Sequence, residues 1–316
     1  MAFAIKLLVS TAVLAWIAYG IDTESLSQTL RHIRPVPLIG AALALSALTF
    51  LQAWRWGFVL RALDAQRPWL ARAANCFIGQ FFNQTLPSTI GGDAIRIWLL
   101  NRTGLPLRPA ANSVLIDRLG ALFALLLLSL LGLPWLADID ANGAAVVSVA
   151  GAASIGICAM ATLLLLDWLP TFVSRTRIVA SIATLSKDGR RVVFRTRAGV
   201  IVVALSVVVH LCVAAAAWLI ARSVQIEVTL GQCFLLIPLV MVASAIPISV
   251  AGWGVREGAM VAALGLVGVP EAGAFAVSLL LGLILIVAGL PGGLLWLRSR
   301  PLPDDAKRPV EGPDKT

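Results

Sequence analysis

Two ten-residue segments, 87–96 and 247–256, share the order and spacing of their residues. Together they give the pattern P-x-[ST]-[IV]-x-G-x-[AG]-[IV]-R. Each segment interrupts an apolar stretch with proline and glycine and ends in an arginine. A guanidinium group binds phosphate oxygens two at a time, so Arg96 and Arg256 are candidates for holding an anionic headgroup. Paired interruptions of this kind point to the binding site of transporters built from two repeats.

Further charged and polar residues near the two arginines are candidates for the same site. A charge near the centre of a bilayer costs about 2.5–3.5 kcal/mol on insertion scales, so such groups are expected to pair or to face a cavity. Asp93 shares a helical face with Arg96, and Asp117 could reach Arg96 from the following span. Arg118 is expected to point elsewhere and to extend toward the inner surface. The candidate substrate-binding residues are Arg96, Arg256, Asp93, Asp117, Glu257, Arg118, Asn83, Gln84, Ser88, Thr89 and Ser249.

Proline and glycine give each segment its turn, and the glycines allow the backbone to approach closely. The amide end of a half-helix that starts after Gly92 would face the anion. In an alternative interpretation these residues make only the turns and the charges pair only with one another. The serines and the threonine would then cap half-helices, and the amide side chains would bond between helices. The hairpin-forming residues are Pro87, Gly91, Gly92, Pro247, Gly252 and Gly254.

The composition places both segments in a membrane. The 316 residues are 59% hydrophobic and 13% charged, and the mean hydropathy is +0.92. A soluble domain of this size cannot bury so much apolar surface. The net charge of +9 comes from basic residues in short loops, which indicates orientation in a membrane rather than nucleic-acid binding. The sequence therefore predicts an all-α, polytopic helical bundle.

About 6 segments are long enough to cross a hydrocarbon core, which requires about 20 residues. The stretches 73–104 and 231–269 each hold two shorter apolar pieces joined by the repeated motif, so we expect two re-entrant helical hairpins. A single transmembrane domain would cover residues 1–297, followed by a disordered cytoplasmic tail at 298–316. The first span also resembles a signal peptide, and we interpret it as retained because further spans follow. The predicted spans are 4–20, 36–54, 111–133, 144–166, 198–220 and 274–297.

The basic residues set the orientation of these segments. If both hairpins return to the side they came from, four regions that together hold 19 of the 25 lysines and arginines face the cytoplasm. Both termini would then be cytoplasmic, in a bacterial inner (plasma) membrane. Three spans separate the hairpins, so they would enter from opposite faces as an inverted repeat and approach each other near the midplane. The cytoplasmic regions are 55–72, 96–110, 167–197 and 298–316.

Motifs for catalysis are scarce. The chain has no G-x-x-x-x-G-K-[ST] loop for ATP, no H-E-x-x-H zinc motif and no G-x-S-x-G nucleophile elbow. Its four cysteines have no metal-binding spacing. We therefore expect no enzymatic activity, no cofactor and no metal. A lipid-modifying membrane enzyme would have only carboxylates available as acid or base.

The segments 81–96 and 246–258, with Asp117 and Arg118 between them, resemble the lysylphosphatidylglycerol synthase transmembrane family, also described as a flippase-like domain. The resemblance covers essentially the whole chain and implies movement of a lipid between leaflets. The soluble synthase domain of some members is lacking, so we expect no aminoacylation of lipid. We hypothesise a lipid translocase that moves an anionic phospholipid, a polyprenyl-phosphate-linked lipid or a related lipid without ATP. The alternative is an accessory membrane protein that binds a lipid intermediate for a glycosyltransferase or lipid synthase. The expected partners are this lipid and such an enzyme, and no nucleic acid.

Overall fold

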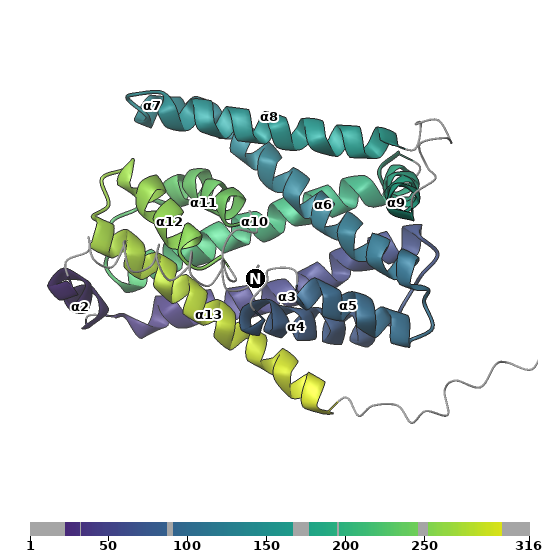
Figure 1. Ribbon diagram of the computed structural model, residues 1–316. Helices are drawn as coiled ribbons and strands as arrows, with labels where there is room; N and C mark the ends of the chain where they lie inside the picture. The colour runs from purple at the N-terminus through teal and green to yellow at the C-terminus, as the bar shows by residue number, and fades with distance from the viewer. Residues whose placement is uncertain are drawn as a thin grey trace, which may run out of the picture.

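The computed structural model describes residues 23–31, 33–86, 91–166, 177–194, 196–245 and 252–298, and the regular elements there are all helices (Figure 1). The predicted span 4–20 and tail beyond residue 298 lie outside the described residues, as do parts of both motifs, 87–90 and 246–251. The helices are α2 (Thr23–Arg31), α3 (Pro35–Ala62), α4 (Trp69–Thr85), α5 (Gly91–Arg102), α6 (Leu107–Leu131), α7 (Leu133–Ile139), α8 (Ala144–Leu165), α9 (Arg177–Phe194), α10 (Ala198–Ser223), α11 (Leu230–Ala245), α12 (Val255–Gly265) and α13 (Glu271–Arg298).

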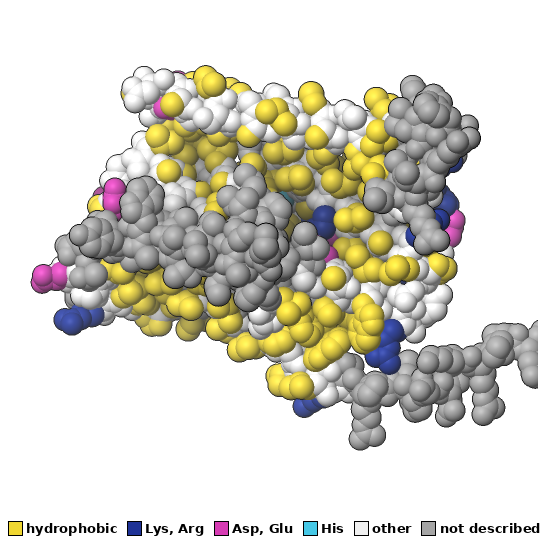
Figure 2. All heavy atoms as spheres, in the orientation of Figure 1, with side chains coloured by type: hydrophobic (Ala, Val, Ile, Leu, Met, Phe, Trp, Pro, Cys, Tyr) yellow, Lys and Arg dark blue, Asp and Glu magenta, His cyan; other side chains and the backbone are white. Residues whose placement is uncertain are grey.

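Five described helices, α3, α6, α8, α10 and α13, are long and apolar enough to cross a membrane. They coincide with five of the predicted spans, and the all-α, polytopic architecture is confirmed. Hydrophobic side chains cover much of the face drawn in Figure 2, and charged side chains gather mainly at its edges. One basic side chain with an acidic one beside it lies within that apolar face.

The helix α3 corrects one predicted boundary. The span was expected to end at residue 54, with a cytoplasmic region beginning at Arg55, but the helix continues to Ala62. Pro35 stands in its first turn, where the missing amide hydrogen is no loss. The chain leaves the helix near Asp64, which has a positive φ of 56°. Arg55 therefore lies inside the bundle and not in a loop.

Each predicted hairpin stretch contains two short helices that pack against each other. The first pair is α4 and α5, and the second is α11 and α12. Gly92 permits the close approach in the first pair, because a Cβ there would lie 1.9 Å from the backbone oxygen of Gly79. In the second pair, Gly252 and Gly254 have φ values of 83° and 88°, which side chains other than glycine rarely adopt.

Small residues also bring α4 against α13. A Cβ on Gly292 would lie 1.9 Å from the backbone oxygen of Phe77, and one on Gly289 would lie 3.3 Å from the Cα of Phe81. Small residues are the usual means by which helices pack closely in membranes. The last described helix, α13, thus packs directly against α4 of the first hairpin.

Two apolar cores accompany the two hairpins. One contains Trp56 and Leu60 of α3 with Leu100 of α5. The other contains Met260 of α12 and Leu281 of α13. The helix α8 takes little part in either, because Ala153 is its one buried residue. In Figure 1 it lies along the outside of the bundle, next to α9 at one end.

Candidate functional site

Five charged side chains from three helices meet inside the first half of the bundle, and we call them the first charge cluster. Arg55 comes from α3, Asp93 and Arg96 from α5, and Asp117 and Arg118 from α6. The hairpin brings α5 beside α6, so residues far apart in sequence become neighbours. Positive and negative groups alternate through the cluster.

Asp117 is the centre of the cluster, with 1% of its surface exposed. Arg55 donates from Nε to Oδ1 at 2.9 Å and from Nη2 to Oδ2 at 3.1 Å, a two-pronged pair. Arg96 approaches Oδ2 from the other side, with its Nη2 at 3.4 Å. The predicted contact between Asp117 and Arg96 is confirmed. One buried carboxylate thus neutralises parts of two guanidinium groups, which a charge in such surroundings requires.

The Arg96 side chain is buried and contacts residues of several helices. Its guanidinium carbon lies 4.3 Å from the centre of the Trp56 ring, a cation–π contact, and its Nη1 lies 3.5 Å from Asp93 Oδ1. A Cβ on Gly79 would come within 2.9 Å of its side-chain carbons, so the glycine makes room for the arginine. Its Nε is buried without a hydrogen-bond partner among the described residues. Only 4% of Arg96 is exposed.

Arg118 is the accessible end of the cluster. The expectation that it points away from the other charges is wrong, because its Nε and Nη2 donate to the carboxylate of Asp93 at 2.7–3.0 Å. Asp93 extends from the neighbouring hairpin helix and supplies a stronger partner than the distant surface. The Arg118 side chain remains 40% exposed. The cluster therefore has three arginines against two aspartates, and its surplus positive charge is reachable at Arg118.

The second charge cluster consists of Arg256, Glu257 and Ser278. The Nη2 of Arg256 lies 2.7 Å from Glu257 Oε1, and the Ser278 hydroxyl donates to the same oxygen at 3.0 Å. The other carboxylate oxygen accepts from the Gly254 amide at 2.5 Å and so caps α12. Arg256 lies over the Trp253 ring at 4.6 Å. Glu257 is fully buried and Arg256 is 4% exposed, so this cluster is neutral and closed.

The remaining candidate residues divide into two groups. Asn83 accepts a hydrogen bond from the Gly92 amide at 2.9 Å, which ties α4 to the start of α5. The amide at this helix end thus bonds to protein and is not left for an anion. The Oε1 atom of Gln84 is buried without a hydrogen-bond partner among the described residues. The candidates outside the described residues are Pro87, Ser88, Thr89, Pro247 and Ser249.

Arg55 is a charged residue of the first charge cluster that the sequence analysis missed. Its spacing from the apolar residues of α3 could have identified it as buried. It falls on the same helical stripe as the buried residues Ala41, Leu45, Leu48 and Val59 of α3. An arginine on the buried stripe of an apolar helix requires a carboxylate partner. Its remaining guanidinium nitrogen donates to Ser206 of α10 at 3.1 Å, which completes its bonding.

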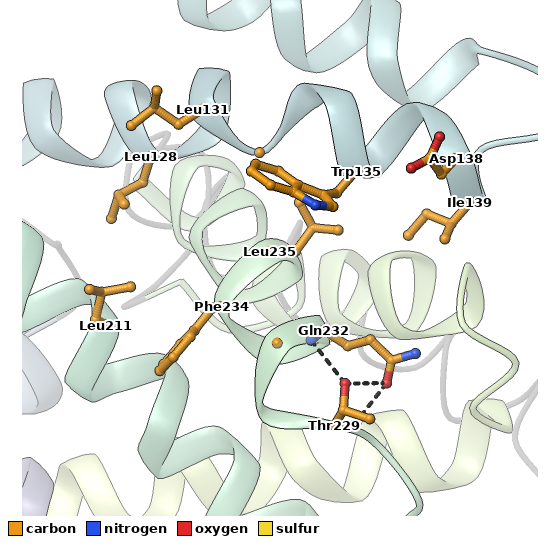
Figure 3. Close-up of a pocket in the computed structure, with 12 residues that line it drawn as sticks. Leu128, Leu131, Trp135, Asp138, Ile139, Leu211, Thr229, Gln232, Phe234 and Leu235 are labelled. Atoms are coloured by element: carbon orange, nitrogen blue, oxygen red, sulfur yellow. Dashed lines mark hydrogen bonds between the residues drawn. The ribbon is translucent and has the colours of Figure 1, made fainter.

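A pocket of about 580 Å³ lies at the far end of α6 (Figure 3). Leu128 at this pocket lies ten positions after Arg118, which is about 15 Å along a helix. Leucines and Phe234 form its apolar walls, and Trp135 of α7 lies across it. Thr229 and Gln232 bond to each other at the start of α11. Asp138 is the sole charged residue in this lining.

Comparison with known proteins gives the family. A sequence model described as the lysylphosphatidylglycerol synthase TM region matches residues 3–293. No curated protein sequence matches the chain significantly. The matched region includes both hairpins, both charge clusters, four of the five described helices that could cross a membrane, and most of the fifth, α13. The chain belongs to the lysylphosphatidylglycerol synthase TM region family.

Proposed function

We propose that this membrane protein is a lipid translocase that carries the headgroup of an anionic phospholipid, polyprenyl-phosphate-linked lipid or related lipid between leaflets. The observation that carries the proposal is the surplus positive charge of the first charge cluster, reachable at Arg118. A surplus cation amid apolar helices is stabilised by an incoming anion. The planar donor fork of Arg118 matches phosphate oxygens.

Arg118 exchanges partners in the proposed cycle. At rest its guanidinium binds Asp93, and an arriving phosphate competes for the same nitrogen atoms. Asp93 can then shift toward Arg96, whose Nη1 already lies 3.5 Å away. The cluster keeps its internal pairing while one charged headgroup enters. Arg96 and Arg256, the two arginines of the repeated motif, then fix the hairpins, and Arg118 makes the first contact.

The pocket beside Trp135 suits the release of the same headgroup. Its lining includes a carboxylate and no lysine or arginine, so it does not hold an anion. An anionic group that leaves the first charge cluster along α6 meets a wide, weakly binding space there. Transport in this scheme uses no ATP, and a gradient or removal of the lipid on the far side supplies the work.

The proposal includes an inner-membrane location with cytoplasmic termini and hairpins inserted from opposite faces. A cysteine-free protein with Arg108→Cys tests the side on which the first hairpin ends, and Glu271→Cys tests the second. A membrane-impermeant maleimide applied to spheroplasts should label Glu271→Cys and leave Arg108→Cys unlabelled until the cells are lysed. Equal labelling of both from outside would overturn the inverted arrangement.

Transport itself is tested in reconstituted vesicles that contain fluorescent phosphatidylglycerol. Dithionite bleaches only the outer leaflet, so protein that moves the lipid makes the protected half of the signal decay faster than in empty vesicles. Fluorescent phosphatidylcholine with the same chains is the matched control for headgroup charge. Tight lipid binding with no movement would support the accessory lipid-binding alternative. Rates equal to those of empty vesicles for phosphatidylglycerol and polyprenyl phosphate alike would overturn the translocase.

A further inference from the structure

A second cavity, of about 610 Å³, lies between α6, α8, α9 and α10. Its wall residues are all apolar side chains or glycine. They include Phe123 from α6, Met160 and Ala161 from α8, Val193 from α9 and Val203 from α10. Its volume falls in the range of small-molecule sites, about 300–1,000 Å³. The absence of any hydrogen-bonding side chain from this lining excludes a headgroup as its occupant.

Hydrocarbon suits this cavity better than water. The cavity is open along α8, where its lining residues Met160 and Ala161 are not buried, so lipid chains outside the bundle can enter it. Water does not fill it well, because a buried water molecule needs two to four polar partners. The helices α6, α8 and α10 are membrane-span candidates, so the hydrocarbon at hand is a lipid chain.

A nearby charge indicates which lipid. Arg197 is exposed just before α10, between the cavity-lining residues Phe194 and Gly199. Basic side chains beside an apolar site in a membrane attract anionic headgroups.

The cavity and the first charge cluster use different faces of α6. Ile116, Leu119 and Gly120 line the cavity, whereas Arg118 points to Asp93 of α5. Successive residues of a helix are about 100° apart, so Arg118 lies on the side opposite to this lining. A lipid whose chain fills the cavity therefore does not place its headgroup on Arg118.

We propose that this cavity is a second lipid site, which holds one acyl chain of an anionic phospholipid whose headgroup lies beside Arg197. The lipid is a resident component that supports α8 and α9 against the bundle. It is distinct from the transported lipid, and its occupancy does not depend on whether the protein is a translocase.

Photo-crosslinking in vesicles tests the second site directly. The probe is phosphatidylglycerol with a diazirine in one acyl chain, added to vesicles that contain the full protein. Labelled peptides are then identified by mass spectrometry. We expect strong labelling of the cavity-lining peptides from α8 and α9, and several-fold weaker labelling by phosphatidylcholine with the same chain.

Two variants of α8 provide the matched comparison. Ala161 lines the cavity and Ala159 does not, so Ala161→Phe places a ring at the cavity and Ala159→Phe places the same ring on another side of α8. Ala161→Phe should remove most of the label from the lining peptides, and Ala159→Phe should leave it unchanged. A thermal unfolding midpoint confirms that both variants are folded. Equal labelling of the two variants, or label spread evenly over the exposed side of α8, would overturn the second site.

Discussion

The two charge clusters share a plan and differ in their charge and access. In each, an arginine of the repeated motif lies over a tryptophan ring, Arg96 over Trp56 and Arg256 over Trp253. In each, a glycine leaves the space that the arginine fills, Gly79 in the first and Gly282 in the second. The second cluster is neutral and closed, whereas the first has a surplus cation at its exposed end.

The difference suggests different roles for the two hairpins. A neutral, closed pair holds a hairpin turn in place and offers nothing to a ligand. In the first cluster, an additional arginine lies at an accessible end, so an anion can compete with Asp93 for Arg118. In our proposal the motif arginine therefore fixes the hairpin in both halves, and Arg118 makes the first contact with the headgroup in the first half.

The largest expected effect comes from removing the central carboxylate. Asp117→Asn leaves Arg55 and Arg96 without their shared buried counter-charge, and breaking a buried pair typically costs about 3–5 kcal/mol. Glu257→Gln in the second cluster affects one arginine and leaves an oxygen that still accepts from Gly254. We expect Asp117→Asn to lower the unfolding midpoint of the detergent-solubilised protein much more than Glu257→Gln. Equal shifts would contradict the central role of Asp117.

The second prediction compares Gly92 of the first hairpin with Gly282 of α13, which lies beside the second charge cluster. Gly92→Ala drives a Cβ to 1.9 Å from a backbone oxygen, which cannot move without separating α4 from α5. Gly282→Ala meets the guanidinium end of Arg256 at 2.2 Å, and a side-chain end can shift. Overpacking of this kind costs about 1–3 kcal/mol, and we expect Gly92→Ala to lie at the upper end and Gly282→Ala at the lower end. The unfolding midpoints of the two variants test this order, and a larger loss in Gly282→Ala would reverse it.

Much of this architecture is predictable from the sequence because apolar length and helix-breaking residues act locally. The long apolar runs predict α6, α8, α10 and α13, and the repeated Pro and Gly predict two helix pairs. The end of α3 was mispredicted because a charged residue suggests a loop when its partner is unknown. Arg55 is compatible with a buried helix only because Asp117 lies opposite, 62 positions later in the chain.

The sequence predicted most residues of the first charge cluster, but it predicted less well which of them form ion pairs with one another. Asp93, Arg96, Asp117 and Arg118 were all identified from their apolar surroundings. The partner of Arg118 was mispredicted, because the choice between Asp93 and the membrane surface depends on the angle at which α5 packs against α6. The placement of α5 depends in turn on its contact with α4, where Gly92 lies against Gly79. Spacing along one helix contains no information about it.

The third prediction separates binding from folding within the first cluster. Arg118→Ala removes the accessible cation and leaves the buried pairs of Asp117 intact, so the protein should fold. A hydrogen bond to a charged group contributes about 1.5–3 kcal/mol. Its loss should reduce transport of fluorescent phosphatidylglycerol at limiting lipid by roughly tenfold or more. Arg118→Lys keeps the charge without the donor fork and should give an intermediate rate. Undiminished transport in Arg118→Ala, with Arg118→Lys as the folded control, would remove Arg118 from the proposed site.

The smallest expected effect lies outside both clusters, at the ion pair between Arg191 of α9 and Asp64 after α3. The two atoms are 2.6 Å apart, but the Asp64 side chain is 76% exposed. Water and salt screen such a pair, and exposed pairs typically contribute about 0–1 kcal/mol. Asp64→Asn keeps a residue type that tolerates the positive φ at this position, so the charge is the main change. We expect an unfolding midpoint close to that of the unchanged protein and equal vesicle transport. A loss as large as that of Asp117→Asn would show that pairing at the surface, and not burial of the pair, stabilises this fold.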